Sequence, residues 1–150
     1  MNMKKNLNNG FTLIELIIVM VILGIMAAVA VPRYLDSISN AEESAEDAVI
    51  SAIRSGLKAA ANDSLYTNGR ASWPTNPFDA LSEKPTGYSL DADDADTDGE
   101  WTFSNGRITH QRADNSRFEW TYTKGTQYGD NAEIGTLGQR TEIGQQTGPG

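Results

Sequence analysis

Residues 10–32 read GFTLIELIIVMVILGIMAAVAVP, and this stretch decides the fold. Residues 11–31 are almost wholly apolar, and as a helix rising about 1.5 Å per residue they span roughly 30 Å, the hydrocarbon thickness of a bilayer. Glu15 interrupts the run. A carboxylate at mid-bilayer costs on the order of 2.5–3.5 kcal/mol, although the cost is lower near a helix end and a partner cation offsets it. We therefore expect a cationic group to pair with Glu15.

Basic residues before the apolar run predict its orientation in a membrane. Lys4 and Lys5 precede the apolar segment, and positive residues there keep that end in the cytoplasm. Two ordinary interpretations are a plain signal anchor and a secretory signal peptide cleaved at the small residues around Ala27–Ala30. The length of the run and the presence of Glu15 argue against the cleaved signal peptide.

The sequence of this region is more specific than either interpretation. Gly10-Phe11-Thr12-Leu13-Ile14-Glu15, followed by Ile22-Leu23-Gly24-Ile25-Met26-Ala27-Ala28-Val29-Ala30-Val31-Pro32, resembles the class III signal of type IV pilins and type II secretion pseudopilins. The resemblance covers roughly residues 4–35. It implies cleavage between Gly10 and Phe11, N-methylation of Phe11, and retention of the apolar helix for anchoring and assembly. It also implies that Glu15 pairs with the terminal amine of a neighbouring subunit, and that Pro32 lies within a continuing helix.

The spacing of Phe11 and Glu15 agrees with this role. Residues i and i+4 lie one turn apart on one helix face, so the carboxylate can reach its own terminal amine or that of an adjacent chain. A carboxylate is also favourable near the positive end of the helix dipole. Because an unpaired buried carboxylate is costly, pairing selects one register between stacked chains. We expect Glu15 to set assembly register and to have no catalytic role.

A second, amphipathic half of the helix is predicted after Pro32. Apolar residues recur there at helical spacing: Leu35, Ile38, Ala41, Ala45, Ala48, Val49, Ala52, Ile53, Leu57, Ala60 and Leu65. Charged residues occupy the remaining positions: Glu42, Glu43, Glu46, Asp47, Arg54 and Lys58. Phe11 to about Tyr66 is thus predicted as one helix kinked at Pro32, about 84 Å long at 1.5 Å per residue. The stripe is expected to pack on a sheet.

The C-terminal part is expected to be that sheet. After a proline-rich connector, strands are predicted at 88–90, 99–104, 107–112 and 117–123, with Asn105-Gly106 as a hairpin turn. Their alternating aromatic residues should cover the helix, with His110 as a packing residue. Residues 124–150 have few aliphatic anchors and are expected either to wrap the sheet edge or to stay mobile.

These features predict an α+β, pilin-like chain: a long kinked N-terminal helix packed on a small antiparallel β-meander. Its expected parts are a removed leader, a transmembrane and assembly half-helix, an amphipathic half-helix, and a globular head with a glycine-rich tail: 1–10, 11–34, 35–66 and 67–150.

The acidic stretch 91–100 suggests a cation site. From Asp94 it reads DADTDG, with oxygen donors at alternate positions and glycine sixth, like the first half of a calcium loop. The twelfth position is Asn105, however, where such loops have a bidentate glutamate. Two interpretations remain open, a calcium site and a solvated acidic loop. The candidate ligands are Asp94, Asp96, Asp98 and Glu100.

Composition excludes several other functions. The formal net charge of −8 disfavours nucleic-acid binding through a basic surface. The chain has no cysteine and one histidine, so thiolate and histidine-rich metal sites are excluded. The same composition disfavours a membrane-anchored enzyme, because a Cys-His catalytic set is impossible and only one histidine could serve a Ser-His-Asp set.

The resemblance implies a structural subunit of a type IV pilus-like filament that polymerises with copies of itself. The implied partners are the prepilin peptidase and methylase and an inner-membrane assembly platform. The precursor would cross the bacterial inner membrane once, and the filament would lie at the cell surface. The alternative is a type II secretion pseudopilin that forms a short periplasmic fibre. The simple head suits a major subunit.

Overall fold

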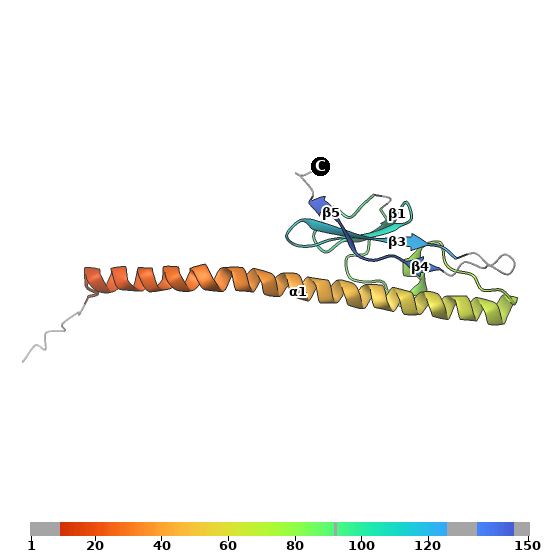
Figure 1. The fold of residues 1–150 in the computed structure, drawn as a ribbon, viewed down its shortest axis with the longest axis horizontal. Helices are drawn as coiled ribbons and strands as arrows, with labels where there is room; N and C mark the ends of the chain where they lie inside the picture. The colour runs from red at the N-terminus through yellow and green to blue at the C-terminus, as the bar shows by residue number, and fades with distance from the viewer. Residues whose placement is uncertain (1–9, 92, 126–134, 146–150) are drawn as a thin grey trace, which may run out of the picture. The chain divides into compact units, whose positions relative to one another are not determined.

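The computed structural model describes residues 10–91, 93–125 and 135–145. The elements are one long helix, a short 3-10 helix and five strands (Figure 1): α1 Leu13–Asn68, η1 Pro77–Ala80, β1 Trp101–Ser104, β2 Arg107–Gln111, β3 Ser116–Thr123, β4 Thr136–Leu137 and β5 Thr141–Gln145. The α+β class with one long N-terminal helix and an antiparallel sheet is confirmed. The chain divides into two compact units, Met1–Glu43 and Ser44–Gly150.

In the first unit, α1 begins at Leu13, two residues after the predicted start, and continues through Pro32. The side chains of residues 10–38 are all exposed in the isolated chain. Proline removes one backbone donor but does not end this helix, as the resemblance implied.

In the second unit, an antiparallel sheet has the order β1-β2-β3, and β3 then pairs with the tail strands β4 and β5. The β1–β2 hairpin turns at Asn105 and Gly106, which have φ angles of 49° and 76°. Two successive positive φ angles are the geometry of a type I′ turn, in which Asn-Gly is strongly preferred. The predicted hairpin is confirmed.

The sheet differs from the predicted meander at its first strand and is extended by the tail. The predicted strand 88–90 contributes only one isolated bridge, Tyr88 with Trp101, so it is not a strand. A turn explains this, because Gly87 just before it has a φ of 83° and its carbonyl accepts from Trp101 N. In contrast, residues 136–145 add strands along the free edge of β3, which confirms wrapping for that part of the tail. Residues 126–134 and 146–150 lie outside the described residues.

The core lies between the helix and one face of the sheet. Buried aliphatic residues of α1 meet aromatic residues of the strands and the connector: Ile50, Ile53, Leu57, Ala61, Trp73, Phe78, Trp101, Ile108, Trp120 and Tyr122. The predicted aromatic face against the helix is confirmed. The predicted stripe was partly wrong, because Ala45, Ala48 and Ala52 are exposed whereas Ile50 is buried. The sheet contacts a narrower helix face than the broad apolar stripe suggested.

The opposite face of the sheet is also covered. Thr102, Ser104, Thr109 and Gln111 are buried, although alternation would leave such polar residues to solvent. The acidic stretch lies over them: Ala95 N donates to Thr109 Oγ1 at 2.7 Å, and Thr102 Oγ1 donates to the Asp93 carbonyl at 2.8 Å. The acidic residues are thus part of a third layer.

Candidate functional site

The helix start carries the first candidate site. Thr12 N and Thr12 Oγ1 both donate to Glu15 Oε2, at 2.8 and 2.9 Å, and Glu15 N donates back to Thr12 Oγ1 at 3.3 Å. This reciprocal pattern is a capping box, which satisfies backbone donors that a helix start leaves free. We did not predict this cap, although the Thr-x-x-Glu spacing of residues 12–15 is its signature in sequence.

The capping box places Glu15 at the very start of the apolar helix. Its carboxylate is held by Thr12 of its own chain, while pairing with a free Phe11 amine requires prior cleavage and stays a prediction. Gly10 and Phe11 precede the helix, and the Phe11 side chain is 84% exposed. The bond between them therefore lies outside the helix in an exposed segment, where a protease can reach it.

The apolar surface that follows is continuous. Large hydrophobic side chains on every side of the helix are exposed: Leu13, Ile14, Leu16, Ile17, Ile18, Val19, Met20, Val21, Ile22, Leu23, Ile25, Met26, Val29 and Val31. Within the described residues, α1 is the one helix long and apolar enough to cross a membrane, a test that signal sequences near an N-terminus also pass. A helix that is apolar all round is stable when lipid or other helices cover it.

The second unit, Ser44–Gly150, contains a cluster of buried charged side chains between α1 and the sheet. Glu46 is fully buried and accepts from Arg112 at two atoms: Nε at 2.7 Å to Oε1 and Nη2 at 2.7 Å to Oε2. His110 Nδ1 lies 2.9 Å from Oε1, and because a carboxylate only accepts, this nitrogen carries the proton. Arg140 Nη1 adds a bond of 3.1 Å to Oε2. One carboxylate thus joins α1 to β2, to the residue that follows β2, and to the tail.

The electrostatics of this cluster are unusual. Burial alone would raise the pKa of Glu46, but hydrogen bonds from Arg112 and His110, together with their charges, lower the pKa to about 2. The Arg112 guanidinium also lies 4.0 Å from the centre of the Phe118 ring, and the Trp101 and His110 rings stack at 4.2 Å. His110 is a buried packing residue, as predicted. Glu46 was predicted among the charged positions outside the apolar stripe, and this prediction is wrong, because its side chain is buried and paired with Arg112 and His110.

A signal for Glu46 was present in the sequence. Glu46, Ile50, Ile53 and Leu57 follow the i, i+4, i+7, i+11 spacing of one helix face, so a carboxylate on that line needs buried cationic partners. Those partners come from residues 110–140, and spacing along the chain does not reveal such distant contacts.

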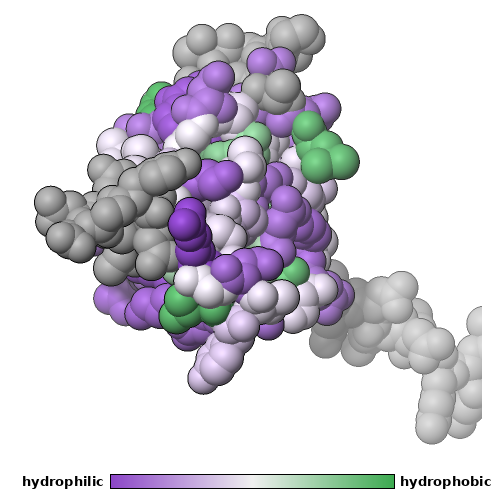
Figure 2. Space-filling model, turned by 90° about the vertical axis from the view of Figure 1, so that its right-hand side faces the viewer, coloured by the Kyte–Doolittle hydropathy of each residue, from purple (hydrophilic) through white to green (hydrophobic). Residues whose placement is uncertain are grey.

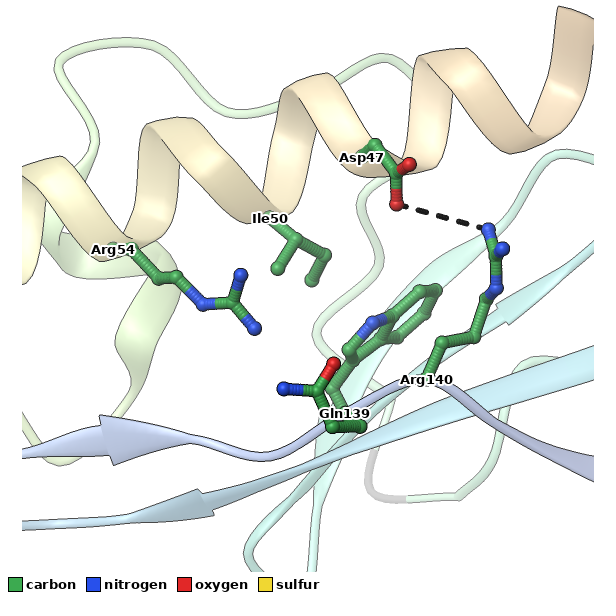
Figure 3. Close-up of a pocket in the computed structure, with 6 residues that line it drawn as sticks. Asp47, Ile50, Arg54, Gln139 and Arg140 are labelled. Atoms are coloured by element: carbon green, nitrogen blue, oxygen red, sulfur yellow. Dashed lines mark ion pairs between the residues drawn. The ribbon is translucent and has the colours of Figure 1, made fainter.

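A pocket of about 350 Å³ opens beside this cluster. It is lined by Asp47, Ile50, Arg54, Trp120, Gln139 and Arg140, and Figure 3 shows the side chains of Arg54 and Gln139 facing each other across it. Arg140 pairs with Asp47 at 3.7 Å, and Arg54 Nη2 donates to the Gly138 carbonyl at 3.1 Å. Both arginines therefore tie the tail to the helix, which accounts for their presence without a ligand.

The candidate calcium ligands are not gathered around one point. Arg107 Nη2 binds both carboxylate oxygens of Asp94, at 3.1 and 3.2 Å. Glu100 Oε2 accepts from the backbone amides of Asp96 and Thr97. In the part of the chain that the structure describes, no group of three or more carboxylate, histidine or cysteine side chains is placed to hold an ion. A calcium site therefore stays an untested prediction for the set Asp94, Asp96, Asp98 and Glu100. Two of its members already have partners, because Asp94 pairs with Arg107 and Glu100 accepts from backbone amides.

The molecular surface at the end shown in Figure 2 is mostly hydrophilic, with a few scattered hydrophobic residues. In the part of the chain that the structure describes, most of the exposed large hydrophobic side chains lie on residues 13–31.

Comparison with known proteins addresses this N-terminal region most directly. The model of the prokaryotic N-terminal methylation motif matches residues 5–31. The chain is 54% identical over 46 residues to the type IV narrow pilus major component of Thermus thermophilus, which is 31% of this chain and 40% of the relative. It is 44% identical over 81 residues to a type IV major pilin protein of Neisseria gonorrhoeae, which is 54% of this chain and 46% of that protein.

A third relative belongs to a secretion system. The type II secretion system core protein G of Pseudomonas aeruginosa is 38% identical over 87 residues, 57% of each chain. The chain thus spans about half the length of the curated relatives it matches. No solved structure matches. The resemblance to pilins and pseudopilins is confirmed by the motif and by these relatives.

Proposed function

For a chain with a prepilin-type N-terminus, whose relatives are type IV pilins and a type II secretion core protein, we propose the role of structural subunit in a type IV pilus-like filament. The observation that carries the proposal is the methylation motif at residues 5–31, which coincides with a helix that is apolar and exposed on every side. Such a surface suits a bilayer before assembly and a packed bundle of helices after it.

Processing and partners follow from the same segment. A prepilin peptidase and methylase would cut between Gly10 and Phe11 and methylate Phe11. The precursor would lie in the inner membrane as a single span, residues 11–34, until an inner-membrane platform adds it to the filament. We assign no catalytic role to the chain.

Charge supports assembly through the helix. Removing residues 1–10 removes Lys4 and Lys5, so 10 basic residues remain against 20 acidic ones and the net charge moves from −8 to −10. Heads of like charge repel one another, which favours solubility over tight contact between heads. The apolar helices therefore supply the attraction between subunits.

A second candidate is a pseudopilin of a type II secretion system, in a short periplasmic fibre. The alignment with core protein G supports it, because it covers 57% of that relative, more than the 40% and 46% covered for the two pilins. Cell fractionation separates the candidates: a pilus subunit is recovered in filaments sheared from the cell surface, and a pseudopilin stays with the envelope after shearing.

The same fractionation in a strain without prepilin peptidase tests the shared part of the proposal. We expect the chain to disappear from the filament fraction and to accumulate in membranes with residues 1–10 attached. Filaments that still contain the chain in that strain would overturn the proposal.

A further inference from the structure

Two Asn-Gly pairs of the head have nearly the same neighbours in sequence. Residues 67–70 read TNGR, and residues 104–107 read SNGR. Asparagine before glycine is a reactive arrangement, because the backbone nitrogen of the next residue can attack the side-chain carbonyl, and glycine, without a Cβ, hinders that approach least. On sequence grounds the two pairs are equally reactive, so any difference between them must come from the fold.

The first pair, Asn68-Gly69, ends α1, and the helix holds its backbone amide. Gly69 follows the last helical residue with a φ of 69°, which is the usual conformation of glycine at a helix C-terminus. Gly69 N donates to the Leu65 carbonyl at 2.9 Å, so this hydrogen bond must break before the nitrogen can attack. Asn68 Nδ2 lies 3.5 Å from Ser64 Oγ, which directs the side chain toward the preceding turn of the helix.

The second pair, Asn105-Gly106, forms the turn between β1 and β2, where the corresponding amide is free. Ser104 pairs with Arg107 at the end of the ladder, so the two residues between them are the whole loop. Among the described residues, neither the Gly106 N–H nor the Asn105 side chain has a hydrogen-bond partner. Asn105 and Asn68 are both exposed, so access to water does not distinguish the pairs. The hydrogen bond on the glycine nitrogen does.

We propose that Asn105 is a site of spontaneous deamidation in the folded chain and that the fold protects Asn68. The Gly106 nitrogen forms a bond to the Asn105 side-chain carbon, the bond from that carbon to Nδ2 breaks, and ammonia leaves with the proton of the Gly106 nitrogen. Water then opens the five-membered imide at either of its two carbonyls. The products are aspartate and isoaspartate, in which the main chain runs through the former side chain. Water is the one co-reactant.

The two products have different effects on the hairpin. Aspartate keeps the length of the main chain and, like asparagine, is favoured before glycine in a type I′ turn. Isoaspartate adds a methylene group to the main chain, so a two-residue loop no longer joins Ser104 to Arg107 in the observed register. Either product adds one negative charge at the turn. Deamidation should therefore weaken the β1–β2 hairpin through isoaspartate.

Incubation of the purified full chain in detergent micelles at mildly alkaline pH, followed by peptide mapping with mass spectrometry, tests the proposal. In the folded chain, deamidation at Asn105 should be roughly tenfold faster than at Asn68 or more, because Asn68 reacts only after local opening of the helix end. In concentrated urea the hydrogen bond to the Leu65 carbonyl is lost, and the two rates should agree within about threefold. Equal rates in the folded chain, or a ratio that urea leaves unchanged, would overturn the proposal.

Asn105→Asp is the matched control for the effect on the hairpin, because it supplies the aspartate product without isoaspartate. Its melting temperature should stay close to that of the fresh wild-type chain, whereas a fraction enriched in isoaspartate should melt at a lower temperature. If that fraction melts together with Asn105→Asp, the proposed effect on the hairpin is wrong. Asp98-Gly99 is an internal reference: Gly99 N donates to the Gln111 carbonyl at 2.8 Å, so isoaspartate should form there faster in urea than in the folded chain.

Discussion

At the scale of single residues, Glu46 joins more segments than any other side chain described above. It contacts β2 through His110, the turn after β2 through Arg112, and the tail through Arg140. An isolated buried carboxylate is costly, but one that receives several charge-assisted hydrogen bonds holds its neighbours in one geometry. The head is therefore expected to respond strongly to changes at this position.

Glu46→Gln should reduce the free energy of unfolding by about 3–5 kcal/mol, because it leaves the Arg112 guanidinium buried without its counter-charge. Urea unfolding of the processed chain in micelles measures this change. The control is Asp47→Asn on the next helix position, where the side chain is 68% exposed and 3.7 Å from Arg140, and the expected loss is below about 1 kcal/mol. Equal losses in the two variants would contradict the role of the cluster.

The same carboxylate predicts a pH dependence. Its pKa falls from 4.5 in the unfolded chain to about 2 in the folded one, so its contribution to stability is complete above pH 4.5 and is lost as pH falls toward 2. The shift corresponds to roughly 3 kcal/mol. Asp114, whose pKa is lowered mainly by the hydrogen bond from the Ser116 side chain, acts in the same direction. Unfolding free energies measured between pH 6 and pH 2 should fall less steeply in Glu46→Gln than in the wild type, and parallel curves would count against this assignment.

Glu15→Ala should reduce filament yield without preventing processing. The variant loses the proposed charge partner of the Phe11 amine and also the cap on Thr12 N, and the loss of a helix cap costs about 1 kcal/mol. Thr12→Ala is the control, because it removes the side-chain part of the capping box and keeps the carboxylate. Normal filament yield from processed Glu15→Ala, measured in the sheared fraction, would show that the carboxylate does not set register.

At the scale of elements, the contact between α1 and η1 depends on one glycine. A Cβ placed on Gly56 would lie 2.3 Å from the Ala80 carbonyl oxygen, so the connector packs directly on the helix backbone. Helix propensity alone favours alanine over glycine by about 1 kcal/mol. The steric contact has the opposite sign and should prevail, because the neighbour is backbone rather than a flexible side chain.

Gly56→Ala should therefore lower the thermal midpoint of the head, as followed by circular dichroism, in spite of its better helix propensity. Ser55→Ala, at the exposed neighbouring position, should leave the midpoint unchanged or raise it slightly. A rise in Gly56→Ala would mean that η1 does not pack as described.

The sequence predicts an element well when neighbouring residues stabilise it, and poorly when residues far away in the chain do. Local signals were sufficient for the long helix and for the Asn105-Gly106 turn, because periodicity and turn preference act over a few residues. They were insufficient for β4 and β5, which are short strands that are stabilised by pairing with β3. The same limit applies to the site: the prepilin signal is contiguous in sequence, whereas Glu46 meets its partners His110, Arg112 and Arg140 only after folding.

At the scale of the whole molecule, we propose that one end of the chain serves anchoring and assembly and that the other keeps it soluble. Exposed apolar side chains are concentrated on residues 13–31, and the acidic residues are mostly in the remainder. Contact between like-charged heads adds little attraction, so polymerisation should depend on the apolar helix.

A chain without residues 1–34 should accordingly be a soluble monomer. The core of residues 50–122 does not include the deleted segment, so the head keeps its packing. Size-exclusion chromatography with light scattering measures the mass, and a head that still forms polymers would place the assembly contacts outside the helix.

The proposed role as a processed filament subunit is tested most directly by mass spectrometry of the N-terminus of this chain in filaments sheared from cells. We expect the chain to be present and to begin at an N-methylated Phe11, with residues 11–34 retained. A chain that begins at Met1 in the filament, or one cut after the apolar run near Ala30, would rule out the proposed processing and assembly.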